Sequence, residues 1–320
     1  MTTLEQASVG PRACCCAPRG PVGAPPLSDP RTRDMVRVPS GSFRMGSDRF
    51  YREERPVRRA EVNAFWIDVY PVTNAQFATF VAATGYVTSA EREPDRALYP
   101  DADPALLVPG SLVFTQPERP VSLRDHRAWW AYVPHASWRH PYGPDSSIEQ
   151  LAEHPVVHVS HEDACAFAAW CGKALPTEAE WERAARGGLE DKTYPWGDEF
   201  APDGQLRANI WLGQFPWQNL KQVGCERTTA VKSFPPNAYG LYDMVGNVWE
   251  WTCSSYASHA GSGACCGGDS QVPSEERRTV KGGSHLCAPN YCLRYRPAAR
   301  QGQTVDTSTS HIGFRCVVRD

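Results

Sequence analysis

The sequence contains no apolar run near the about 18 residues that a membrane-spanning helix needs. Its opening residues, MTTLEQASVGPRACCCAPRGPVGAPP, lack the hydrophobic core of a secretory signal. Excess positive charge is also missing, because the formal net charge is -3 at pH 7. We therefore expect a cytoplasmic protein that binds neither a membrane nor nucleic acid.

Three common catalytic motifs are absent: the GxSxG nucleophile elbow, the Walker phosphate loop and the HExxH zinc motif. The chain has 12 cysteines but no CxxC pair, which is the usual half of a structural zinc site. So many cysteines without a signal segment favour a reducing compartment, where thiols stay free or bind metal.

Proline, glycine and tryptophan are plentiful, with 28, 25 and 11 residues. Frequent Pro and Gly shorten regular elements, so we expect short strands, much irregular backbone and aromatic packing between loops. The expected fold class is α+β, as one irregular, loop-rich domain over residues 34–320. Residues 1–33 have no periodicity and are predicted to be a disordered tail, in which Cys14, Cys15 and Cys16 are incidental.

Local patterns predict several elements. Residues 35–47 alternate and turn like a hairpin, and 61–73 and 154–160 have the composition of strands. Residues 91–145 carry many Pro, Asp and Trp and are expected to form a long irregular insertion.

Three helices are predicted from their capping residues. One covers 74–83 after Thr73, with Gln76 in the capping-box position, and a second runs from Ser160 to Cys171. The third follows Thr177, with Glu180 completing its capping box.

The stretch GGSHLCAPNYCLRYRPAAR at 282–300 contains Cys287 and Cys292, separated by four residues. This spacing suits a loop that folds back and brings both sulfurs together. Two thiolates with no other donor suit a soft monovalent ion, for which Cu(I) is the natural choice. The residues alone leave a disulfide, a metal site and free thiols equally open.

The stretch HPVVHVSH places His154, His158 and His161 close together. On a strand, His154 and His158 would share one face but lie about 13 Å apart, which is too far for one metal ion. We interpret all three as structural histidines.

Seven blocks follow one another in an order that resembles the formylglycine-generating enzymes, or sulfatase-modifying factors. The blocks are HPVVHVS, GKALPTEAEWERAARGG, YPWGDE, NIWLGQFPWQN, FPPNAYGLYDMVGNVWEWT, KGGSHLCAPNYCLRYRPAAR and DTSTSHIGFRC. The resemblance covers about residues 35–318 and includes both cysteines of the last loop. It implies the loop-rich, C-type-lectin-like fold of that family, and it favours the metal site over the disulfide.

What the resemblance implies is a copper-dependent oxidase. The family uses O2 to convert a cysteine in a Cys-x-Pro-x-Arg motif of an unfolded sulfatase to Cα-formylglycine. Carried over, Cu(I) lies between Cys287 and Cys292, and the substrate thiolate joins as a third sulfur. Loss of hydrogen from the substrate Cβ gives a thioaldehyde, which hydrolyses to the aldehyde. Ser284 would line the oxygen pocket, Tyr291 would lie beside the second cysteine, and Trp249 near the substrate sulfur.

The resemblance also implies structural calcium sites, built from carboxylates, amides and carbonyls. One site maps onto the side chains of Asp243 and Glu250 and the carbonyls of Gly246 and Val248. In DMVGNVWE, an Asp and a Glu beside a tight Gly-Asn turn fit that role.

A second calcium site maps onto Asn209, Ile210, Val223 and Cys225. The family usually has a ligating Asp where this chain has Val223, and valine offers only a carbonyl. This departure weakens or removes the site.

Other departures surround the active loop. Ala288-Pro289-Asn290 replaces a more polar segment of many relatives, and His311 stands where an Asn is common. The cysteines that form disulfides in secreted relatives lack partners here, because Ala168, Ala185 and Pro297 take their places while Cys316 remains. For Arg294 and Arg296, salt bridges are the preferred interpretation.

Two other functions stay open. A non-catalytic binding module of the same fold could use the insertion at 91–145, although a mere binder has no need of the cysteine pair. A related oxidase acting on small thiols would usually carry an N-terminal helical domain with a histidine-rich iron motif, for which the segment before residue 34 is too short.

Overall fold

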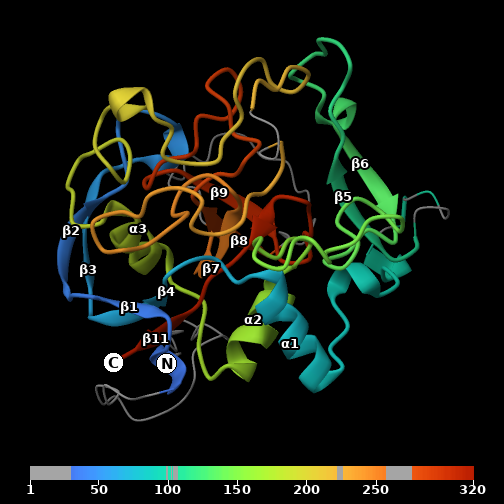
Figure 1. The fold of residues 1–320 in the computed structure, drawn as a ribbon, viewed down its shortest axis with the longest axis horizontal. Coiled ribbons are helices and arrows are strands. Elements are labelled where there is room, and N and C mark those ends of the chain that lie inside the picture. Colours follow the sequence, from blue (N-terminus) through green and yellow to red (C-terminus); the bar gives the residue numbers. More distant parts are fainter. Residues whose placement is uncertain (1–29, 99, 102, 104–106, 222–225, 257–275) are drawn as a thin grey trace, which may run out of the picture.

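The computed structural model describes residues 30–98, 100–101, 103, 107–221, 226–256 and 276–320. Within these ranges the chain has three α-helices and eleven short strands (Figure 1). The helices are α1 (Asn74–Thr84), α2 (His161–Trp170) and α3 (Glu178–Arg186). Short 3-10 turns lie at Pro30–Thr32, Arg52–Glu54, Ser89–Glu91, Arg96–Leu98, His126–Ala128 and Pro202–Gly204.

The strands form four small sheets. A three-stranded antiparallel sheet has the order β1 (Met35–Val38), β4 (Phe65–Asp68), β11 (Val317–Arg319). A four-stranded sheet has the order β10 (Ile312–Gly313), β7 (Trp249–Ser255), β8 (Arg277–Lys281), β9 (Arg300–Thr304), with β10 parallel to β7. Two hairpins complete the set, β2 (Gly41–Met45) with β3 (Arg58–Val62) and β5 (Gly110–Phe114) with β6 (Trp130–Pro134). The expected α+β class with little regular structure is confirmed.

All three predicted helices are present. Thr73, Ser160 and Thr177 cap their N-termini, and each takes part in a capping box with the residue three positions later. Gly85 and Gly187 end α1 and α3 in the left-handed conformation, as C-terminal glycines do. These signals are local, so the sequence shows them without tertiary context.

The strand predictions fared less well. The hairpin expected over 35–47 is wrong, because Val38 pairs with Phe65 while Gly41 pairs with Val62. The strand expected over 61–73 is divided between β3 and β4, which belong to different sheets. Alternation specifies extended backbone but not the partner strand, which lies elsewhere in the chain.

Two further expectations need correction. Residues 154–160 form no strand apart from one bridge at Pro155, because His158 has a φ of 59° and cannot continue a β-strand. The insertion at 91–145 is not wholly irregular, since it carries the β5–β6 hairpin, which stands to the right of the molecule in Figure 1. The 3-10 turn at Pro30–Thr32 lies within the predicted tail, whose earlier residues are outside the described ranges.

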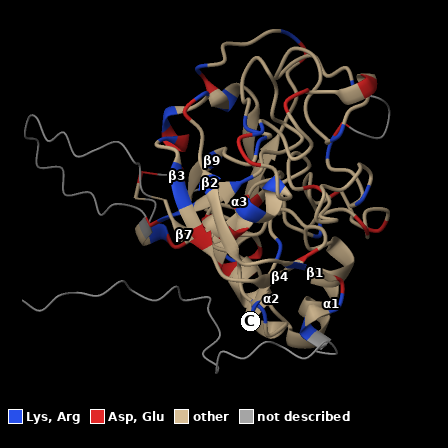
Figure 2. Ribbon diagram, turned by 90° about the vertical axis from the view of Figure 1, so that its left-hand side faces the viewer, with Lys and Arg blue, Asp and Glu red and all other residues tan. Residues whose placement is uncertain are grey.

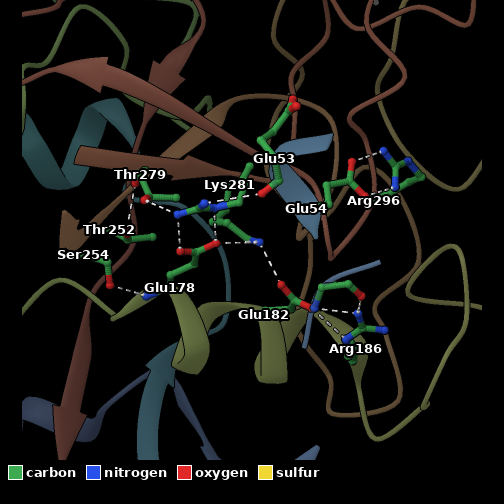
Figure 3. A network of polar contacts seen from close by, with 12 residues as sticks. Glu53, Glu54, Glu178, Glu182, Arg186, Thr252, Ser254, Thr279, Lys281 and Arg296 are labelled. Atoms are coloured by element: carbon green, nitrogen blue, oxygen red, sulfur yellow. Dashed lines mark hydrogen bonds and ion pairs between the residues drawn. The ribbon is translucent and has the colours of Figure 1, made fainter. Parts of the chain in front are cut away.

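A buried ion network fixes α3 against the four-stranded sheet (Figure 3). The Nζ of Lys281 on β8 donates to Glu182 at 2.9 Å and lies 3.6 Å from Glu178. Arg300 on β9 donates to both carboxylate oxygens of Glu178, and Arg186 donates to Glu182. Because neighbouring carboxylates and cations share these contacts, the buried charges are compensated.

Charge and hydropathy agree with the sequence expectations at a coarse level. No helix of the described residues combines the length and apolarity needed to cross a membrane. Lys and Arg are interspersed with Asp and Glu along the ribbon (Figure 2).

Candidate active site

The loop that carries the two cysteines begins directly after β8 with two glycines in the left-handed region. Gly282 has a φ of 92° and Gly283 a φ of 72°. A Cβ on Gly283 would lie 2.9 Å from the backbone carbonyl of Arg294. The beginning and the end of the loop therefore touch, and only glycine allows that approach.

Cys287 and Cys292 face each other across this loop. Their Sγ atoms are 3.0 Å apart, and their side chains are 1% and 8% exposed. The amide of Cys287 donates to the carbonyl of Ser284, and that of Cys292 to the carbonyl of Ala288, so two consecutive turns bring the sulfurs together. The separation exceeds the about 2.05 Å of a disulfide bond, and both residues are free thiols. The prediction that the loop folds back is confirmed.

The two thiols have opposite acidities. Burial raises the pKa of Cys287 well above its usual value, and the neighbouring Cys292 raises it further. The hydrogen bond from Cys287 and the nearby Arg294 guanidinium lower the pKa of Cys292. The pair therefore carries its first negative charge on Cys292, with the proton kept on Cys287.

Arg294 has a position that sequence reasoning missed. Its Nη1 lies 3.9 Å from the Sγ of Cys292, and its Nη2 forms an ion pair with Glu53 at 2.5 Å. The guanidinium also lies over the ring of Tyr51, whose hydroxyl accepts a hydrogen bond from Leu293. Tyr51 and Glu53 are more than 200 residues away in the chain, so no local pattern could indicate them.

The salt bridges preferred for the two arginines are present. Arg294 pairs with Glu53, and Arg296 pairs with the fully buried Glu54. The 3-10 turn Arg52–Glu54 therefore forms a wall beside the cysteine loop, and Figure 3 shows Glu54 and Arg296 directed at each other.

An aromatic wall adjoins the cysteines. Tyr291 stacks on Phe215 with ring centroids 4.6 Å apart and contacts Trp129 edge-on at 5.5 Å. Tyr291 is 39% exposed, so its ring lies partly at the surface beside Cys292. Burial and the charge of Cys292 raise its pKa, which keeps the phenol neutral.

Ser284 and Trp249 lie deeper. Ser284 is fully buried, and its hydroxyl accepts a hydrogen bond from the amide of Leu286. Trp249 is 3% exposed and belongs to the same buried cluster as both cysteines. The structure thus places both residues in the packing around the sulfur pair.

The first expected calcium site has a mixed fit. The carboxylate of Asp243 accepts hydrogen bonds only from the amide of Lys232 and the side chain of Asn247. Burial raises the pKa of Asp243 to about 6, so the ionised form lacks charge compensation that a cation could supply. Both oxygens of Glu250, however, accept from Arg315, and one also accepts from Trp181.

The carbonyl ligands of this site lie on one tight turn. Gly246 has a φ of 76° and Asn247 a φ of 58°, and a Cβ on Gly246 would lie 2.5 Å from the carbonyl oxygen of Asn209. The turn that holds Gly246 and Val248 is therefore packed directly against the second expected calcium site.

The second expected calcium site does not fit the ion. The side-chain oxygen of Asn209 accepts a hydrogen bond at 2.9 Å from the ammonium of Lys221. A positive charge on the ligand oxygen repels a divalent cation. Ile210 is buried beside it, while Val223 and Cys225 lie outside the described residues.

The histidines occupy structural positions. His158 is fully buried and bonded to Ser111 and to the carbonyl of Pro141, and His154 contacts Thr228. His161 packs edge-on against Trp251. The runs at Cys14–Cys16 and Cys265–Cys266 lie outside the described residues.

The donor chemistry of the sulfur pair decides which metal fits. Within the described part of the chain, no group of three or more His, Cys, Asp and Glu side chains is placed to hold a metal ion. A tetrahedral zinc site has no ligand set there. Two soft sulfurs, one of them favoured as a thiolate, fit a soft monovalent ion such as Cu(I).

The fold and the site together define a class: loop-rich α+β proteins that hold a buried pair of thiols on a tight loop. A family model described as "Sulfatase-modifying factor enzyme 1-like domain" matches residues 24–320. The chain belongs to this family.

Individual relatives agree with that assignment. The chain is 54% identical over 291 residues to the formylglycine-generating enzyme of Mycobacterium tuberculosis, covering 89% of this chain and 97% of the relative. It is 41% identical over 295 residues to a Bos taurus protein named inactive C-alpha-formylglycine-generating enzyme 2, covering 91% and 89%. The solved structure of PvdO from Pseudomonas aeruginosa has a TM-score of 0.60 at 24% identity, covering 89% of this chain and 94% of PvdO, and shows the shared fold.

Proposed function

We propose that this chain is a formylglycine-generating oxidase. It would act on a cysteine within a Cys-x-Pro-x-Arg motif of an unfolded sulfatase polypeptide, use O2 as the oxidant and release the aldehyde Cα-formylglycine. The observation that carries the proposal is the buried pair of free thiols, Cys287 and Cys292, with sulfurs 3.0 Å apart. Family membership alone is insufficient, since a relative named inactive shares the fold at 41% identity.

Cu(I) bound by Cys287 and Cys292 would supply a soft centre for the substrate thiolate and for reaction with O2. Arg294 stabilises negative charge on Cys292, because its guanidinium is the cation nearest that sulfur among the printed contacts. Glu53 holds Arg294 in place through their ion pair. The net reaction removes two electrons and two protons from the substrate S–H and Cβ–H bonds, and water then replaces sulfur in the thioaldehyde.

The neighbouring side chains exclude water and orient the peptide. Tyr291, Phe215 and Trp129 form an aromatic wall on one side of the pair. We infer that the substrate peptide lies along the exposed edge of Tyr291, because Cys287 is almost inaccessible while Cys292 is slightly open. Ser284, which is buried beside Cys287, closes the other side.

Calcium is proposed at the Asp243 site only. Asp243 would bind through its carboxylate and Gly246 and Val248 through carbonyls. Glu250 retains acceptor capacity on the oxygen that receives only the Arg315 bond. A calcium ion there would keep Asp243 ionised at neutral pH.

Mass spectrometry of a Cys-x-Pro-x-Arg peptide tests the proposal. After incubation with copper-loaded protein in air, the peptide should lose sulfur and gain an aldehyde, and a Cu(I) chelator should prevent this. Cys287→Ala and Cys292→Ala should each abolish both the product and Cu(I) binding. Cys171→Ala is the matched control, since Cys171 is a free, half-buried thiol outside the pair. Full activity in the Cys287→Ala, Cys292→Ala double variant would contradict the proposal.

A second candidate is a non-catalytic binding module, favoured by the inactive relative. It predicts that the peptide binds without change of mass, whatever copper is present. The same experiment therefore separates the two functions.

We also infer a reducing, cytoplasmic compartment. Five described cysteines are free, among them the fully buried Cys316, although Cys165 is disulfide-bonded. Thiol counting on protein purified with and without reductant tests this inference: at least these five thiols should be found in both.

A further inference from the structure

The ammonium group of Lys221 occupies an unusual position. Its Nζ donates to the side-chain oxygen of Asn209 at 2.9 Å and to the carbonyl oxygen of His285 at 3.2 Å. Asn209 is 2% exposed and His285 is 3% exposed, so both acceptors are buried. A single cation thus joins two separate segments inside the molecule.

The orientation of Asn209 is fixed by its other contacts. Its amide nitrogen donates to the carbonyl of Arg227 at 2.8 Å and faces Thr229 and Asn247 at 3.3 and 3.4 Å. The oxygen must therefore point toward Lys221, and an amide flip would place two donors against each other. The site is built to present an oxygen to a cation.

Charge accounting explains why that cation is a lysine. The family site combines a divalent ion with one carboxylate, which leaves one net positive charge. This chain has Val223 in place of that carboxylate, and Lys221 alone supplies one positive charge. A calcium ion added beside the ammonium would face repulsion with no carboxylate to offset it.

The second acceptor links Lys221 to the cysteine loop. His285 is two residues before Cys287, and both its amide and its Nδ1 bond to the carbonyl of Asn247. The carbonyl of Cys287 accepts from the amide of Trp211. The loop is thus tied at successive positions to the segment that carries Asn209, and Lys221 closes one of these ties.

We propose that the Lys221 ammonium replaces the calcium ion at the Asn209 site, so that this site binds no calcium, and that it positions the loop carrying Cys287. The replacement is independent of the reaction that the loop performs. The positioning role rests on the proposed function.

Calcium dependence of the melting temperature tests the replacement. The Asp243→Asn variant removes the other proposed calcium site, and its melting temperature should not change between EDTA and millimolar calcium. Adding Lys221→Ala and Val223→Asp to that background restores the family's ligand types. This chain should bind one calcium ion by native mass spectrometry and melt higher with calcium than with EDTA.

A single substitution gives an independent measurement if the combined variant does not fold. Lys221→Met leaves two buried oxygens without their donor, so the melting temperature should fall by roughly 3–8 °C, and calcium should not restore it. Lys192→Met, at an exposed lysine paired with Asp198, is the matched control and should change little. Full recovery of Lys221→Met by calcium would overturn the replacement. So would a calcium response of Asp243→Asn that disappears on adding Asn209→Ala.

Cu(I) affinity tests the positioning role separately. Lys221→Met should weaken Cu(I) binding roughly tenfold, the low end of effects beyond the direct ligands. An unchanged affinity would remove the positioning role and leave the calcium result standing. Absence of Cu(I) binding in the unsubstituted chain would instead contradict the proposed function.

Discussion

At the scale of single residues, the important feature is the unequal acidity of two adjacent thiols. Cys287 is buried without a cation, whereas Cys292 accepts a hydrogen bond from it and lies 3.9 Å from Arg294. One proton is therefore shared unequally by the pair. A site of this kind can bind a soft cation by releasing fewer protons than two neutral thiols would.

Substitution of Arg294 should shift that acidity. In metal-free protein, Arg294→Met removes the cation that lowers the pKa of Cys292, so the thiolate should form at a higher pH. Ultraviolet absorbance of the thiolate against pH measures the change, with Cys292→Ser as the reference. Arg52→Met, on the same 3-10 turn as Glu53 but exposed, should leave the curve unchanged.

Gly283 should be far less replaceable than another glycine of similar conformation. Gly283→Ala places a Cβ 2.9 Å from backbone atoms of Arg294, whereas Gly85→Ala meets nothing within 4 Å. Both have a φ near 70°, so the backbone cost of about 1 kcal/mol is common to the two. Urea unfolding should show at least about 1 kcal/mol more loss for Gly283→Ala, together with weakened Cu(I) binding. Equal losses would mean that the loop relaxes away from the contact.

At the scale of elements, α3 is held by charge as well as by packing. Its buried carboxylates, Glu178 and Glu182, each have their own arginine, and Lys281 lies between them. The backbone carbonyl of Glu53 also accepts from Arg300. The network of Figure 3 therefore supports the same 3-10 turn that holds Arg294 beside Cys292.

The members of this network should differ in their contribution to stability. Glu178→Gln leaves the buried Arg300 without its carboxylate and should lower the free energy of unfolding by about 3–5 kcal/mol. Lys281→Met should cost less, because each carboxylate keeps an arginine. Urea denaturation compares the two, and a larger loss for Lys281→Met would refute this ranking.

The elements also show what a sequence can predict. All three helices follow from capping boxes, whose partners are three residues apart. The strands were harder to predict because β1 pairs with β4, and β11 lies on the other side of β4, some 250 residues later. No local pattern contains such a pairing.

At the scale of the whole molecule, buried histidines should determine acid stability. Burial lowers the pKa of His158 and His161 to about 4 and that of His311 to about 3. Their unfolded value is near 6.5, so the unfolded chain takes up protons first as the pH falls. Their stabilising effect is complete above pH 6.5 and is lost as the pH falls toward 4.

A histidine substitution should flatten this dependence. His161→Phe keeps the edge-on contact with Trp251 and removes the titrating group, which accounts for roughly 2–3 kcal/mol between pH 6.5 and 4. Melting temperatures across that range should therefore fall less steeply in the variant. His126→Gln, at an exposed position, serves as the control. An unchanged slope in His161→Phe would show that other groups dominate acid unfolding.

The sequence by itself determined the features whose causes are local. It specified the helix caps, the abundance of loops, and a spacing of Cys287 and Cys292 that lets one loop close on itself. It also showed the missing carboxylate at Val223. In each case the interacting groups are a few residues apart, or the residue type alone carries the information.

Only the tertiary structure decided which distant groups meet. It brought Arg294 beside Cys292 against Glu53, and it placed the ammonium of Lys221 between Asn209 and His285. These contacts join segments tens to hundreds of residues apart. Such contacts form only when packing of the whole core fixes where each segment lies, so no pattern along the chain predicts them.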